Sequence, residues 1–126
     1  MNSGILTNRD NNSLTHSLEL RVERIIRDAE RLYGYSFPPV TVIITHDSPE
    51  AYGVALMEGG IIWISERATN SRAVIYHELL HALFGLDHVK GCPLLDSHID
   101  SDLDRDICDA LFLQYTENWG LEDYVA

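Results

Sequence analysis

The chain has few basic residues, few cysteines and no long apolar run. Nine Lys and Arg stand against 20 Asp and Glu, which gives a formal net charge of −11. An acidic chain repels phosphate, so nucleic acid is a poor general partner. Cys92 and Cys108 are too few for a disulfide framework and fit a reducing compartment. With no apolar run for a membrane span or a secretion signal, we expect a cytoplasmic location.

The length and the distribution of polar residues predict one folded unit. A chain of 126 residues is long enough for a single hydrophobic core. Residues 1–13 are polar, and we expect them to form a disordered arm. Residues 14–126 then make one domain, since no linker or repeat divides them.

The spacing of apolar residues predicts an α+β domain. Leu18, Val22 and Ile25 recur at helical intervals within a helix that runs from about Leu14 to Tyr33. Three strands are predicted next, at Val40–Thr45, Tyr52–Met57 and Ile61–Ser65, with a turn at Glu58–Gly59. A second helix follows and ends before Gly85. A last helix begins with a Ser101/Asp104 capping box and ends near Trp119, before Gly120. We expect the second and third strands to form a hairpin in a small twisted sheet.

One stretch, from His77 to His88, carries most of the chemical information. It begins with H-E-x-x-H, in which His77 and His81 are four residues apart. On a helix these two residues share a face, so both imidazoles can bind one metal ion. Glu78 is then placed to reach a water molecule beside that ion. The pattern favours a Zn²⁺ site of a hydrolase.

The residues around the motif predict a buried helix. Residues 73–86 are almost wholly apolar, apart from the motif itself, and a helix that is apolar on all sides is a buried one. Asn70 or Ser71 can cap its start, and Gly85 can end it in a left-handed turn. Buried imidazoles need partners, because an unpaired buried polar group is costly.

A catalytic zinc site needs a third protein ligand, for which His88 is the best candidate. The turn at Gly85 can bring His88, three residues later, back toward the metal. Asp87 and His98 are alternatives, and Asp87 could instead orient a ligand imidazole. Cys92 as a fourth ligand would close the site and make the zinc structural.

The run from His77 to His88 resembles the zincin metallopeptidases. It is similar to the metzincin pattern H-E-x-x-H-x-x-G-x-x-H, with one extra residue before Gly85 and with Leu94-Leu95 roughly where that branch has a methionine turn. The strand pair before the motif looks like that of the SprT-like family. The resemblance implies a minimal zincin fold, with His77, His81 and His88 as Zn²⁺ ligands. Gluzincin-like relatives, including the ImmA/IrrE group, imply instead an acidic ligand on the last helix, for which Asp102, Asp106 and Asp109 are candidates.

These observations predict zinc-dependent hydrolysis of peptide bonds, with Glu78 as general base. The substrate would be a protein or peptide, and a single dedicated partner protein is one form of this hypothesis. The strand Ile61–Ser65 could pair with an extended substrate. Tyr76, Tyr115 and Tyr124 are candidates for stabilising the oxyanion. Two alternatives stay open, namely a zinc endoribonuclease of the ribosomal-RNA-processing type and a non-catalytic zinc-binding or interaction module.

Overall fold

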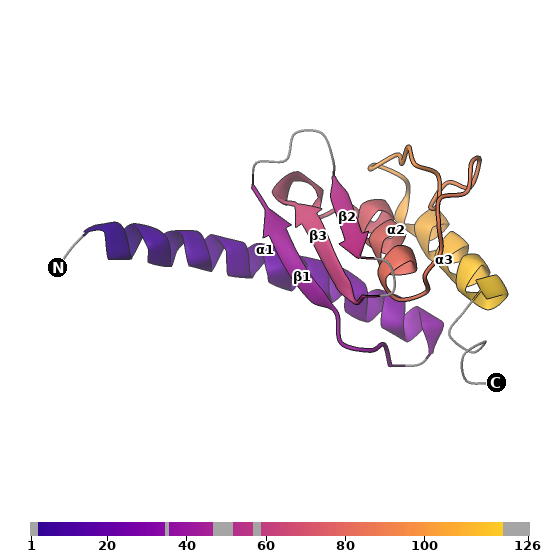
Figure 1. Ribbon diagram of the computed structural model, residues 1–126, viewed down its shortest axis with the longest axis horizontal. Helices are drawn as coiled ribbons and strands as arrows, with labels where there is room; N and C mark the ends of the chain where they lie inside the picture. Colours follow the sequence, from indigo (N-terminus) through magenta and orange to yellow (C-terminus); the bar gives the residue numbers. More distant parts are fainter. Residues whose placement is uncertain (1–2, 35, 47–51, 57–58, 120–126) are drawn as a thin grey trace.

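The computed structural model describes residues 3–34, 36–46, 52–56 and 59–119, and it is an α+β fold (Figure 1). Its elements follow the predicted order. They are α1 (Ser3–Tyr33), β1 (Thr41–Thr45), β2 (Gly53–Leu56), β3 (Ile61–Ser65), a short 3₁₀ helix (Glu66–Ala68), α2 (Arg72–Ala82) and α3 (Arg105–Trp119). Three predicted features fall outside the described residues. They are the end of a strand at Met57, the turn residue Glu58 and the helix stop at Gly120. No helix in the described ranges combines the length and the apolar character that a membrane span requires.

The three strands form a mixed sheet in the order β1-β3-β2. The predicted hairpin is confirmed, because β2 and β3 are antiparallel, with Gly53 opposite Ile64. β1 pairs with β3 in parallel, with Val42 opposite Ile62. The central strand β3 is therefore paired on both sides, and the predicted pairing of a substrate with Ile61–Ser65 is wrong. Among the described residues, β2 is the edge strand nearest α2.

The helices cover one face of the sheet. α1 contacts β1, α2 contacts β2 and β3, and α3 packs against both other helices (Figure 1). The inward side chains of β1 and β3 are buried, among them Ile44, Ile62 and Ile64, whereas Ile43 and Val54 on the other face are exposed. Every residue of α2 from Ala73 to Ala82 is buried, as the sequence predicted. The motif helix is thus held from several sides, which fixes the direction of its side chains.

The start of α1 differs from the sequence pattern. The helix begins at Ser3 rather than near Leu14, and its first part extends beyond the rest of the molecule (Figure 1). The apolar spacing marks a part of the helix that packs on the core, which among the residues with described side chains begins at Leu18. The sequence also predicted that residues 1–13 form a disordered arm outside the domain. That division of the chain stays a prediction, although the backbone is helical from Ser3.

The ends of α2 follow the predicted signals, whereas the start of α3 does not. Ser71 caps α2, since its hydroxyl accepts the N–H of Val74 at 3.2 Å. The helix ends at Ala82, two residues before the predicted end at Phe84. The predicted Ser101/Asp104 capping box is wrong: Asp104 caps α3 by accepting the N–H of Asp106 at 3.0 Å. The Ser101 carbonyl instead accepts the Ser71 hydroxyl at 2.7 Å, which ties the segment before α3 to the start of α2.

Candidate metal centre

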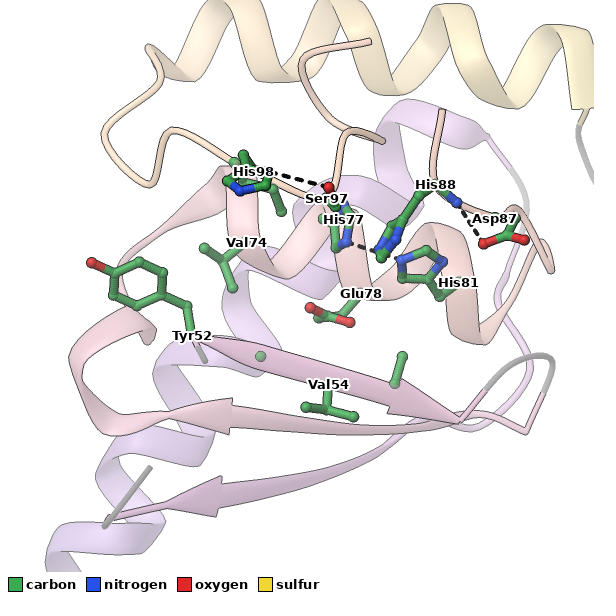
Figure 2. Close-up of a pocket in the computed structure, with 13 residues that line it drawn as sticks. Tyr52, Val54, Val74, His77, Glu78, His81, Asp87, His88, Ser97 and His98 are labelled. Atoms are coloured by element: carbon green, nitrogen blue, oxygen red, sulfur yellow. Dashed lines mark hydrogen bonds between the residues drawn. The ribbon is translucent and has the colours of Figure 1, made fainter. Parts of the chain in front are cut away.

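Three imidazoles converge at the C-terminal end of α2. His77 and His81 lie on successive turns, and His88 comes from the segment that follows the helix (Figure 2). One ring nitrogen from each lies within 4.8 Å of the others, and the ring centroids are 4.4 to 5.2 Å apart. His77 and His81 are buried, whereas His88 is exposed. The structure therefore brings together the three residues that the sequence selected as metal ligands.

The hydrogen bonds of the two buried rings fix their tautomers. Nδ1 of His77 lies 2.6 Å from the carbonyl oxygen of Leu94, and Nδ1 of His81 bonds to the carbonyl of Leu86. A carbonyl can only accept, so each Nδ1 carries a proton, and in the neutral ring Nε2 then presents a lone pair. These two Nε2 atoms are 2.9 Å apart. Both imidazoles are thus oriented as metal ligands usually are, with the second nitrogen held by a backbone oxygen.

Two lone pairs that face each other at this distance repel, and a positive charge between them would relieve the repulsion. A proton could bridge them if one ring were charged, but burial lowers the pKa of His77 to about 4 and also lowers that of His81. Both shifts disfavour a proton shared between the two rings. A divalent cation could be held there by the three imidazoles, and neutral imidazole is a common ligand of Zn²⁺.

A tight turn after α2 presents the third imidazole. Gly85 has φ +65° and donates its N–H to the His81 carbonyl at 3.2 Å, which is the predicted left-handed stop. Asp87 accepts the backbone N–H of His88 at 2.7 Å. Asp87 therefore shapes the turn, and the hydrogen bonds that hold the buried imidazoles come from backbone carbonyls instead.

The alternative ligands lie elsewhere. Among the described residues, the three histidines are the only group placed to share a metal ion, so Cys92 and His98 are outside it. Both cysteines are free thiols. Asp102 and Asp106 are exposed, and Asp109 accepts the Tyr76 hydroxyl at 2.7 Å. The structure does not bring the acidic residues of the last helix to the imidazoles.

A network of side chains explains the position of Asp109. The Arg72 guanidinium bonds to Asp28 on α1 at 2.8 Å, to the Tyr76 hydroxyl at 2.7 Å and to Asp109 on α3 at 3.3 Å. Tyr76 thus points toward this network, and neither Tyr76 nor Tyr115 is among the residues that line the cleft at the imidazoles. The structure therefore does not bring these two candidates for oxyanion stabilisation to the site. Tyr124 lies outside the described residues.

Glu78 lies beside the imidazoles with its carboxyl group in the cleft (Figure 2). The residue is only 4% exposed, and in the described part of the chain no side chain or backbone group forms a hydrogen bond or ion pair with its carboxyl group. Burial raises the pKa of Glu78 to about 8. A buried carboxyl group without a protein partner, placed next to three imidazoles, has the proximity and the basicity that a general base requires.

The cleft around these residues has a volume of about 610 Å³ and runs between β2 and the segment before α3 (Figure 2). Its lining adds residues that sequence reasoning did not select: Tyr52, Gly53, Val54, Ala55, Val74, Ser97 and Ile99. A glycine inside an otherwise apolar strand was the available signal for Gly53, because such a residue often marks a close approach of the backbone to another group. The others had no sequence signal, since only the pairing of β2 with β3 brings them to the site.

The metal-free protein is expected to be most stable at mildly acidic pH. The folded-state pKa of Glu78, about 8, exceeds its ordinary 4.5, so its contribution is full below 4.5 and is lost as pH rises toward 8, by up to about 5 kcal/mol. The pKa of His77 falls from 6.5 to about 4, so its contribution is full above 6.5 and is lost as pH falls toward 4. Denaturant unfolding with a chelator, at a series of pH values, measures both limbs. Glu78→Gln should abolish the decline above pH 6.5, and a wild type that gains stability from pH 6.5 to 8 would contradict this account.

Comparison with known proteins finds no family model, no curated protein and no solved structure that matches the chain. The resemblance to zincins thus depends on the stretch from His77 to His88 and on the arrangement of its side chains. Function has to be argued from the geometry of the site.

Proposed function

We propose that this protein is a zinc-dependent metallopeptidase of the minimal zincin type. The observation that carries the proposal is the pair of buried Nε2 lone pairs that face each other at 2.9 Å, with a third imidazole within reach. An unpartnered carboxyl group beside them, that of Glu78, supports a hydrolase over a purely structural site. A structural zinc site would use four protein ligands, whereas three histidines leave one position open.

The metal would be held by His77, His81 and His88. Three neutral nitrogen ligands suit Zn²⁺, and the backbone carbonyls at Leu86 and Leu94 keep the two buried rings in the ligating tautomer. When bound, Zn²⁺ supplies Lewis acidity, which polarises a substrate carbonyl and makes water a better nucleophile.

Glu78 would perform the proton transfers. Its carboxylate takes a proton from the attacking water and then donates that proton to the departing amine nitrogen, as in general acid–base catalysis. Burial favours such transfers, because it keeps the affinity of the carboxylate for the proton high. Only 4% of the residue is exposed, and the residue lines the cleft.

The substrate we infer is an extended peptide. β2 forms one wall of the cleft, and its outer edge carries no strand among the described residues. A peptide could add to this edge by backbone hydrogen bonds and so pass beside the imidazoles. Asp87 in the cleft and the net charge of −11 would repel a phosphodiester, which favours a peptide over RNA. The two free thiols fit a cytoplasmic location.

Metal analysis combined with a cleavage assay tests the proposal. The purified protein is expected to contain about one zinc per chain and to cleave an unfolded protein substrate. A chelator should abolish the cleavage, and added Zn²⁺ should restore it. Labelled RNA incubated in parallel should stay intact. Cleavage of the RNA alone would favour the endoribonuclease, and zinc binding without either cleavage would favour a binding module.

A further inference from the structure

The first residue of β2, Gly53, lies against the Glu78 side chain. A Cβ atom built on Gly53 would be 2.8 Å from Oε2 of Glu78, 2.9 Å from its Cγ and 3.2 Å from its Cδ. The first two distances are shorter than real Cβ contacts. Any side chain at position 53 would therefore displace the Glu78 carboxyl group or the strand.

The backbone gives no other reason for glycine at this position. The described glycines with left-handed φ are Gly34, Gly60, Gly85 and Gly91, so the conformation of Gly53 is open to other residues. Glycine within a strand also weakens it, because it has no side chain to pack and loses more chain entropy on folding. The missing side chain at Gly53 is thus explained by the space that Glu78 occupies.

Neither β2 nor α2 is free to move away from the other and so relieve an overlap at position 53. Gly53 is paired with Ile64 of the central strand, and the adjacent Tyr52 carbonyl accepts the N–H of Ser65 at 2.8 Å. Glu78 sits in the middle of α2, which is buried along its length and is tied to α1 and α3 through Arg72. A clash at position 53 would consequently be relieved at the flexible end of Glu78, its carboxyl group.

We propose that Gly53 is a positioning residue that sets the place of the Glu78 carboxylate between β2 and the three imidazoles. This role rests on the proposed peptidase function. Gly53 contributes no reacting atom and acts through Glu78 alone. Because a displacement of about 1 Å can cost on the order of 10²-fold in rate, a single methyl group at this position affects turnover more than folding.

Gly53→Ala is expected to lower the kcat for peptide cleavage about 10-fold to 100-fold and to leave KM and zinc content nearly unchanged. KM holds because the backbone groups of β2 remain, and zinc content holds because no imidazole is touched. In a Glu78→Gln background the same change should cause no further loss, since the two residues act as one unit. A Gly53→Ala protein that cleaves at the wild-type rate would overturn the positioning role.

A second readout does not depend on activity. In the metal-free protein, Gly53→Ala should lower Tm when Glu78 is present. In a Glu78→Ala background it should leave Tm unchanged or raise it, because the space is then free and alanine restricts the unfolded chain. Equal Tm changes in the two backgrounds would show that Gly53 does not act through Glu78 and would overturn the proposal.

Gly59→Ala is the matched control. A Cβ there would be 2.5 Å from Cδ2 of Leu56, which is a closer overlap than at Gly53 but with a side chain outside the cleft. This variant should keep the wild-type kcat and KM, and a loss equal to that of Gly53→Ala would overturn the positioning role. A wild-type protein that cleaves no peptide would overturn the peptidase function itself, whereas the Tm comparison would still decide whether Gly53 acts through Glu78.

Discussion

Glu78→Gln is expected to lower the kcat for peptide cleavage by about 10² to 10⁴, while the protein still folds and binds zinc. Glutamine has nearly the same shape as glutamate, so it fits the buried slot beside Gly53. Its amide cannot take a proton from water at neutral pH, which removes the step assigned to the carboxylate. Steady-state kinetics on a fluorogenic peptide, together with metal analysis of the same sample, measure both effects.

Glu66→Gln serves as the control for this change. The Glu66 carboxylate lies away from the cleft and bonds to His46 at 3.0 Å, so its loss should leave kcat within about two-fold of the wild type. A Glu78→Gln protein that retains zinc and cleaves at the wild-type rate would refute the assignment of Glu78 as general base.

Zinc is expected to stabilise the folded protein strongly. A ligand that binds only the folded state adds about 4 kcal/mol at a free concentration of about 1,000 times its Kd. The shift should be visible as a rise in Tm when the chelated protein is given Zn²⁺ in excess. His81→Ala should lose most of this rise, because it removes one of the two Nε2 atoms that face each other at 2.9 Å.

Two further variants identify the third ligand. His88→Ala should reduce the zinc-dependent rise in Tm, since His88 completes the group of three imidazoles. His98→Ala should leave it unchanged, because His98 lines the cleft but lies outside that group. If His98→Ala abolished the rise and His88→Ala did not, the coordination proposed for His88 would be wrong.

Local spacing made much of the site predictable. His77 and His81 share a helix face whenever residues 72–82 are helical, and Glu78 follows from the same geometry. Gly85 predicted the turn that brings His88 back toward the other two imidazoles, because its left-handed conformation is unfavourable for most residues. The α+β class and the hairpin also followed from patterns within short segments.

The parts that could not be predicted depend on contacts between distant segments. The sequence of Thr41–Thr45 does not predict that this strand pairs in parallel with β3. That pairing places β3 in the centre of the sheet and leaves β2 as the edge strand beside the cleft. The Leu94 carbonyl reaches His77 across 17 positions of the chain. Asp109 was a candidate ligand because the sequence does not show that it pairs with Arg72, which is 37 positions away. Apolar spacing likewise did not indicate that α1 begins at Ser3 rather than near Leu14.

The hydrogen bonds that orient His77 and His81 end on main-chain oxygens, which every amino acid supplies. Replacement of Leu86 or Leu94 by another apolar residue would keep the acceptor, so the ligating tautomers tolerate sequence drift at both positions. Insertions and deletions are a different matter. One residue added or removed between Gly85 and Leu94 would move the carbonyl of Leu86 or Leu94 away from the imidazole that it now orients. Among homologues of this chain, the length of this segment should therefore vary less than its composition.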